Sequence, residues 1–232
     1  MQALSVEDPI REEQERVEDH LLHDLRFCSL LGAEAWSRLP PAVRRRFSKR
    51  LGAGAAITYA GTIIECRRTL LGKLLAQFCR LIGGPLPLTD DIDVPAIVTV
   101  TEDGSNMGQF WTRQYGRTRG FPQVIHSSKR FVGPTGLEEY LGCGIAIALT
   151  VSADASALHF HSDHYFVAVG SVRLRLPRWL EPGALTISHV DRQDETFAFV
   201  LKLRHPLFGD LICQTGIFQE RFIQNAEEAR ND

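Results

Sequence analysis

The stretch DETFAFVLKLR, residues 194–204, alternates in hydrophobicity with a period of two. Successive side chains of a β-strand point to opposite faces of its sheet, so every second residue shares a face. Phe197, Phe199, Leu201 and Leu203 lie on one face of this stretch, and smaller or charged side chains lie on the other. The pattern predicts a strand whose aromatic and leucine side chains are in the core.

Further stretches have the composition of strands, and turn signals such as Gly133-Pro134-Thr135-Gly136 separate them. They are residues 55–68, 97–101, 109–115, 123–131, 144–151, 158–169, 185–190 and 209–218. Strands joined by short turns must be antiparallel, because a parallel crossover needs about a dozen residues or more. A sheet of this many strands has open edges unless it closes on itself. We therefore predict an α+β, mainly β fold: a strongly curved antiparallel sheet or barrel, calycin-like, with N-terminal helices and one inserted helix.

Three segments have helical periodicity instead. Residues 12–27 are charged on one side and apolar on the other, which predicts an amphipathic helix. A short basic helix is expected at about 40–50, where Pro40 and Pro41 fit the first turn. A leucine-rich helix is expected over 69–82, with Thr69 as its cap and Gly83 at its end. The expected organisation is an N-terminal helix (1–27), one barrel domain (28–222) and a flexible tail (223–232).

Charge and cysteine content narrow the functional classes. The chain has 26 basic and 28 acidic residues, a formal net charge of −2, so no strong field attracts nucleic acid. The uncharged stretches 51–64 and 140–153 are shorter than the roughly 20 residues of a membrane span. The five cysteines are scattered, which is typical of reduced, buried thiols. With no secretory signal at Met1, we expect a cytoplasmic protein that neither binds nucleic acid nor spans a membrane.

The most informative polar residues fall on predicted strands. Trp111 and Arg113 share one strand face, and Ser127 and Lys129 share a face of the next strand. If these faces are interior, Arg113 needs a partner, and Glu139 is the obvious one. Trp111, Arg113, Lys129 and Glu139 are therefore candidate ligand-binding residues, suited to an anionic group on a partly hydrophobic ligand. The alternative is a buried Arg–Glu pair that only holds the barrel closed.

Histidines offer two weaker candidates. His159 and His161 share a strand face, and His164 or His189 could supply the third ligand of a metal site. Ordinary surface histidines are the alternative, and we assign neither a metal nor a cofactor. An acid/base pair of Glu139 with His126 is also compatible with the sequence.

Several short motifs carry a family resemblance. They are LPPAVR at 39–44, YAG at 59–61, WTR at 111–113, Glu139 followed by Gly142, PRWLEP at 177–182, and the hairpin over 197–216. With them the chain resembles the bacterial family called domain of unknown function 4166, over roughly residues 27–220. One departure is Gln214-Thr215-Gly216, where a Tyr-x-Gly is more usual. Because similar domains occur fused to NAD-binding proteins of the saccharopine-dehydrogenase and short-chain types, the resemblance implies a possible oxidoreductase partner.

Three functional hypotheses follow. The first is a binding module whose barrel encloses a small, partly hydrophobic anion. The second is an enzyme in the same cavity that uses Glu139 as a general acid or base. The third is an interaction subunit that docks on a separate oxidoreductase through its N-terminal helix, residues 1–27.

Overall fold

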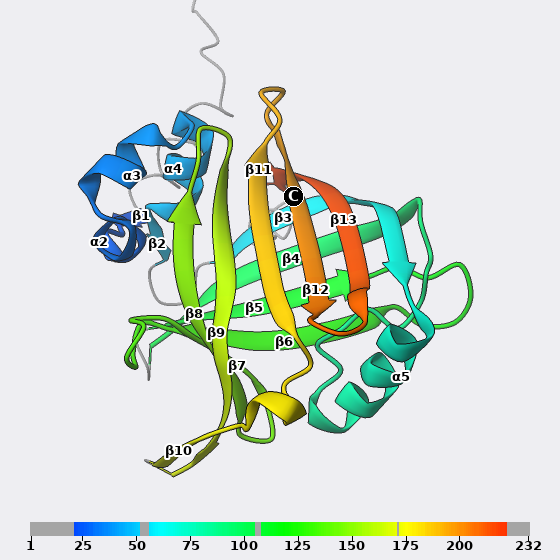
Figure 1. Cartoon of the computed structure of the whole chain (residues 1–232). Coiled ribbons are helices and arrows are strands. Elements are labelled where there is room, and N and C mark those ends of the chain that lie inside the picture. Colours follow the sequence, from blue (N-terminus) through cyan, green and yellow to red (C-terminus); the bar gives the residue numbers. More distant parts are fainter. Residues whose placement is uncertain (1–20, 52–55, 105–107, 171, 222–232) are drawn as a thin grey trace, which may run out of the picture.

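The computed structural model of this chain describes residues 21–51, 56–104, 108–170 and 172–221 (Figure 1). The expected tail over 223–232 and most of the expected N-terminal helix, residues 12–20, lie outside these ranges.

The strands form a closed antiparallel barrel, as the period-two stretches predict. Ten strands build it: β3 (Ala56–Arg68), β4 (Val94–Asp103), β5 (Gly108–Tyr115), β6 (Gln123–Arg130), β7 (Glu138–Gly142), β8 (Ile145–Ala153), β9 (Ala157–Val169), β11 (Ala184–Asp191), β12 (Thr196–His205) and β13 (Gly209–Arg221). Neighbours pair in the order β9-β11-β12-β13-β3-β4-β5-β6-β7-β8, and β8 pairs again with β9. Closure satisfies the backbone groups that an open sheet would expose at its edges. The short strand β10 (Val172–Arg175) extends the sheet from β9.

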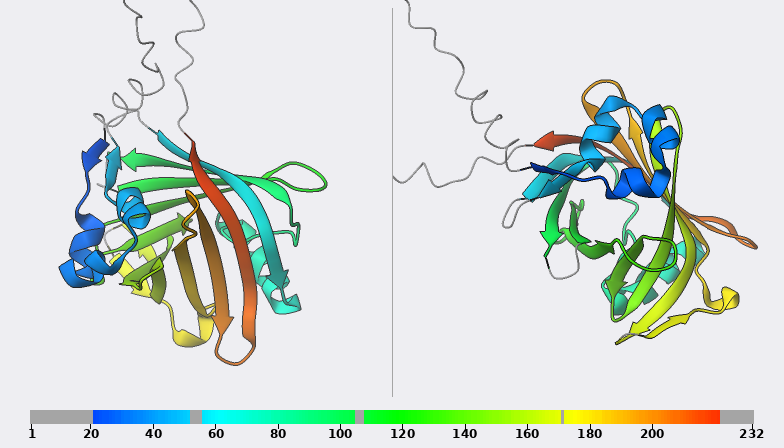
Figure 2. Two further views of the ribbon diagram at one scale, coloured as in Figure 1. Left: turned by 90° about the horizontal axis from the view of Figure 1, so that it is seen from above. Right: turned by 90° about the vertical axis from the view of Figure 1, so that its left-hand side faces the viewer.

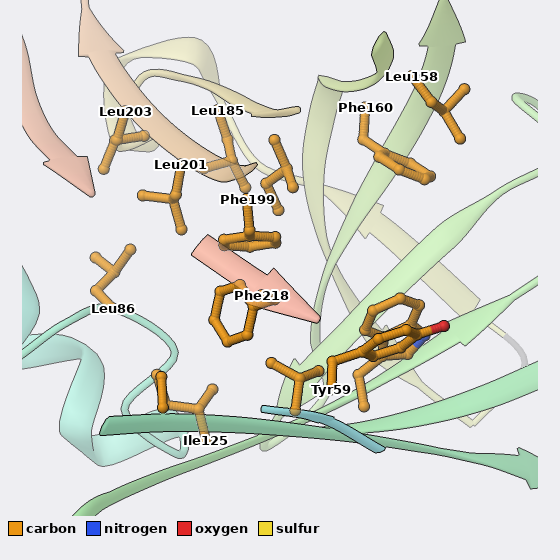
Figure 3. Close-up of a cluster of buried hydrophobic side chains, with 14 of the residues drawn as sticks. Tyr59, Leu86, Ile125, Leu158, Phe160, Leu185, Phe199, Leu201, Leu203 and Phe218 are labelled. Atoms are coloured by element: carbon orange, nitrogen blue, oxygen red, sulfur yellow. The ribbon is translucent and has the colours of Figure 1, made fainter. Parts of the chain in front are cut away.

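The interior follows the predicted alternation. Phe197, Phe199, Leu201 and Leu203 of β12 are all buried. Figure 3 shows Leu201 and Leu203 on one side of the interior, with Leu86 and Ile125 on the other. The short strands β7 and β10 are additions to the expected set.

Three short helices close one end of the barrel. They are α2 (Arg26–Leu31), α3 (Ala33–Arg38) and α4 (Pro41–Phe47), and they lie at the opposite end from α5 (Leu70–Phe78) (Figures 1 and 2). The rings of Phe27 and Phe47 pack on Phe160 of β9, with centroids 5.9 and 5.8 Å apart. These aromatic contacts fill the barrel interior at this end.

Two predicted helices are shorter than the sequence pattern indicates. The helix expected over 12–27 is wrong at residues 21–23, which form β1 (Leu21–His23), and the helix expected at 40–50 ends at Phe47, before β2 (Lys49–Leu51). β1 and β2 pair with each other, and long-range pairing of this kind overrides local helix propensity. The carboxylate of Asp24 accepts the backbone N–H of Arg26 at 2.9 Å and pairs with its guanidinium, just before α2 begins.

The inserted helix lies between β3 and β4, as predicted. Thr69 Oγ1 accepts the N–H of Gly72 at 3.2 Å, α5 continues into a 3-10 turn, η1 (Cys79–Ile82), and Gly83 follows with a φ of 99°. Most of its large apolar side chains, however, are exposed: Leu70, Leu71, Leu74, Phe78 and Leu81. The helix packs on the barrel through small residues instead, and Gly72 and Ala76 are buried.

The five cysteines are free thiols. Cys66 is buried as expected, whereas Cys143 is exposed at the β7–β8 turn, where its φ is 49°. Among the described residues, no helix combines the length and the apolar character needed to cross a bilayer.

Candidate ligand-binding cavity

A cavity of about 260 Å³ occupies the part of the barrel near α5. Residues of β5–β9 and β11–β13 form its walls. Residues of α5, η1, the 85–87 loop and the segment 176–182 line its end near α5, which we call the cavity mouth. Most lining side chains are apolar, and Ile125, Leu185, Phe199, Leu201 and Leu203 are among them (Figure 3). The polar lining residues are Arg113, Tyr115, Glu139, Tyr165 and Gln214. The volume is just below the roughly 300–1,000 Å³ of typical ligand pockets.

Arg113 of β5 and Glu139 of β7 both line the cavity, with β6 between their strands, and their side chains contact each other. Arg113 Nη2 is 3.2 Å from Glu139 Oε1, and Nη1 donates to Ser127 Oγ at 3.0 Å. Ser127 Oγ donates in turn to Glu139 Oε1 at 2.7 Å. The predicted pairing of Arg113 with Glu139 is therefore confirmed as a contact.

Lys129 completes the cluster from the strand next to β7. It stands opposite Glu139 in the β6–β7 register, and its Nζ donates to Glu139 Oε2 at 2.8 Å. The ammonium also lies 4.9 Å from the centre of the Trp111 ring. One carboxylate thus faces two cations, and we call Arg113, Ser127, Lys129 and Glu139 the charged cluster.

The electrostatics of the cluster keep Glu139 ionised. Burial alone raises the pKa of its carboxyl, but the charges of Lys129 and Arg113 and the hydrogen bonds from Lys129 and Ser127 together outweigh burial and lower the pKa to about 2. Burial lowers the pKa of Lys129, and Glu139 opposes that shift. The cluster therefore holds two basic side chains and one carboxylate inside the barrel.

The four predicted site residues lie close to one another, but only some of them line the cavity. Arg113 and Glu139 are lining residues. Trp111 lies beside a smaller void of about 20 Å³ with Phe27 and Phe47, and its Nε1 donates to Gln109 Oε1 at 3.3 Å. The WTR motif and the Glu139–Gly142 motif thus join in one cluster between the cavity and the helix-filled end.

A match to a family model covers residues 39–218 of the 232, under the description domain of unknown function (DUF4166). The chain belongs to this family. The predicted family membership is confirmed over most of the barrel. No curated protein and no solved structure matches the chain.

His189 is a residue of this DUF4166 domain whose environment the sequence did not reveal. Its ring lies within 6.1 Å, centroid to centroid, of five aromatic rings: Phe47, Trp111, Phe160, Phe197 and Phe199. Its Nδ1 is buried without a hydrogen-bond partner among the described residues. Burial, together with nearby Arg46, Lys129 and Arg113, lowers the pKa of His189 well below 6.5, so the ring is neutral.

Gln214 is a second residue that was not among the ligand-binding residues expected from the sequence. It lines the cavity, its side chain is buried, and among the described residues nothing donates a hydrogen bond to its Oε1. The signal that marked it was its departure from the Tyr-x-Gly pattern of similar sequences. The DUF4166 domain thus has a polar amide in a mostly apolar wall.

The histidine candidates do not assemble in this domain. His159 and His161 bond to Ser188, Asp154, Ser152 and Thr186, whereas His189 is on the interior face of its strand. No metal-ligating group of three is present within the described ranges. The pair of Glu139 with His126 is also wrong, because His126 is exposed and contacts Thr112.

Proposed function

We propose that this domain binds a small, partly hydrophobic anion inside the barrel, with the anionic group at Arg113 and the apolar part along the leucine-lined walls. The observation that carries the proposal is the excess positive charge of the charged cluster at an otherwise apolar cavity.

The charge balance favours an anion over a neutral ligand. Glu139 offsets one of the two cations, and a buried charge without a counterpart is costly. An entering carboxylate would supply that counterpart. A guanidinium carries five N–H donors. Among the described residues Arg113 uses one each toward Ser127 and Glu139, which leaves donors for a ligand.

The walls favour an aliphatic or aromatic body on the ligand. Phe199, Leu201 and Leu203 of β12 face the cavity with Ile125 of β6. Burying apolar ligand surface against them contributes about 25 cal/mol per Å² before the costs of binding. Medium-chain carboxylates such as octanoate have this combination of a charged head and an apolar chain.

The enzyme alternative has less support. A general acid or base works best with a pKa near the working pH, and the pKa of Glu139 is about 2. A permanently ionised Glu139 is suited to positioning Arg113 and Lys129. In the alternative of an interaction subunit, residues 1–27 were expected to dock on an oxidoreductase. Residues 1–20 of that segment lie outside the described part of the chain.

The experiment begins with native mass spectrometry of the freshly purified protein, followed by calorimetric titration with octanoate and octanol. We expect octanoate to bind at one site and octanol to bind at least tenfold more weakly, a difference of about 1.4 kcal/mol. Equal binding of the two would show that the cluster does not recognise an anion. Failure of hexanoate, octanoate and decanoate alike, with no co-purifying mass, would overturn the proposal.

A matched pair of variants places the binding in the cavity. Leu203→Trp adds volume at the wall and should abolish octanoate binding, whereas Leu207→Trp adds the same ring at an exposed position of the following turn. Retained octanoate binding in Leu203→Trp would indicate that binding occurs outside the cavity.

A further inference from the structure

The helix α5 presents an apolar face that nothing in the described structure covers. Leu70, Leu74 and Phe78 are 74, 50 and 70% exposed, and Leu81 of the following turn η1 is 79% exposed. A helix on a soluble barrel normally buries its apolar face. Here the buried residues are Gly72 and Ala76, and a Cβ on Gly72 would lie 2.2 Å from the carbonyl oxygen of Leu211. Close backbone contact thus holds the helix and leaves Leu70, Leu71 and Leu74 exposed.

A second segment beside the cavity mouth has the same character. Residues 172–180, VRLRLPRWL, expose Val172, Leu174, Trp179 and Leu180, and Trp179 is 79% exposed. This segment and α5 both lie along the lower edge of the barrel in Figure 1. We call the exposed side chains of residues 70–82 and 172–180 the mouth face.

The mouth face is continuous with the cavity. Leu75, Cys79 and Ile82 of the first segment line the cavity, as do Leu176 and Leu180 of the second. The side chains that line this end of the cavity therefore come from the same two segments as the exposed apolar ones. Whatever covers the mouth face would also cover this end of the barrel.

The charges of the mouth face have one sign. Lys73 and Arg80 fall in residues 70–82, Arg173, Arg175 and Arg178 fall in 172–180, and neither segment contains an acidic residue. All five are exposed, although Lys73 pairs with Asp90 and Arg173 with Glu138. Because the Debye length is about 8 Å at physiological salt, such a local cluster acts at a surface despite the net charge of −2.

We propose that the mouth face docks on the surface of an anionic lipid bilayer, with its apolar side chains in the interface and its cations at the lipid phosphates. Exposed leucine and aromatic side chains with flanking Lys and Arg are the composition that lies in a membrane interface. The cavity mouth then opens toward the acyl chains, from which a ligand could enter without crossing water. This entry route rests on the proposed function, whereas the docking does not.

The test is flotation of the full chain with vesicles of phosphatidylcholine alone or mixed with an equal part of phosphatidylglycerol. We expect the wild type to float with the mixed vesicles and much less with phosphatidylcholine. Leu74→Glu and Trp179→Glu should each weaken binding roughly tenfold. Leu25→Glu is the control, because Leu25 is 54% exposed beside α2, at the helix-closed end.

The outcomes separate the two proposals. Retained octanoate binding in Leu74→Glu shows that the barrel is folded and the cavity intact, so that a loss of flotation reflects docking. Flotation of the wild type without octanoate binding would support docking and contradict the proposed function. No flotation on either vesicle, or equal losses with Leu25→Glu, would overturn the docking proposal. So would concentration-dependent dimerisation in sedimentation velocity that Leu74→Glu abolishes, because a second copy of the chain would then cover the face.

Discussion

Lys129 and Glu139 stand directly opposite each other on β6 and β7, and their charged atoms are 2.8 Å apart in the interior of the barrel. Both side chains are 3% exposed. Arg113 reaches the other oxygen of the same carboxylate at 3.2 Å. This arrangement makes Glu139 the single counter-charge of two buried cations.

Removing that counter-charge should be costly for folding. In Glu139→Gln, two like charges remain buried without a carboxylate, and we expect a loss of about 3–5 kcal/mol in the free energy of unfolding. The double variant Lys129→Met/Glu139→Gln should recover a large part of that loss, because only one cation remains. Urea denaturation measures the stability of both variants.

Glu65→Gln is the control. Glu65 pairs with Arg67 at the surface, and the substitution should cost less than about 1 kcal/mol. A Glu139→Gln variant as stable as the control would contradict the charge balance described here.

Arg113→Met should affect ligand binding more than stability. Lys129 still neutralises Glu139 in this variant, so no buried carboxylate is left unpaired. We expect octanoate binding to fall at least tenfold while the free energy of unfolding changes by less than about 1.5 kcal/mol. Titration calorimetry and urea denaturation on the same sample test this. The opposite result, a large stability loss with binding retained, would mean that the pair only holds the barrel closed.

Most of the fold could be predicted from the alternation of apolar and polar side chains along single strands. The burial of Phe197 to Leu203 follows from period two, and barrel closure follows from the number of short-linked strands. Period two also put Arg113 and Lys129 on definite strand faces, but it did not show that those faces are interior. Pairings between distant segments did not follow. β1 pairs with β2 across the short helices, and helical periodicity in either segment carries no information about that partner.

Periodicity also shows that a helix is amphipathic without showing which face is buried. In α5 the buried face is set by the close approach of Gly72 to Leu211 of β13. These two residues are far apart in the sequence. The same limit applies to the site. Sequence spacing placed Trp111 and Arg113 on one face, but only the packing of Phe27 and Phe47 at one end leaves Arg113, and not Trp111, beside the cavity.

Stability should fall in acid in two stages. His189 has a folded-state pKa well below 6.5, so below about pH 6.5 the unfolded chain binds a proton that the folded chain does not. Stability then drops by up to about 1.4 kcal/mol per pH unit from this residue. Glu139 adds a second loss as the pH falls from about 4.5 to about 2, because its folded-state pKa is lowered to about 2.

His189→Phe isolates the first stage. Phenylalanine fits an aromatic environment and does not titrate, so the variant should lose less stability than the wild type between pH 6.5 and 5. The difference between the two denaturation series removes the contribution of His161, whose pKa burial also lowers. Parallel curves for the two proteins over this range would show that His189 is protonated equally in the folded and unfolded chain.

Gly72→Ala should loosen α5 from the barrel. The added Cβ would lie 2.2 Å from the carbonyl oxygen of Leu211 and 3.1 Å from the side chain of Ile212, so the helix must shift. Helix propensity alone would favour alanine by about 1 kcal/mol, whereas overpacking costs about 1–3 kcal/mol. We expect a net loss of stability by urea denaturation, together with faster amide exchange in residues 70–78. Gly104→Ala is the control, because nothing lies within 4 Å of its added Cβ. A stabilised Gly72→Ala would mean that the leucines, and not the glycine, hold the helix in place.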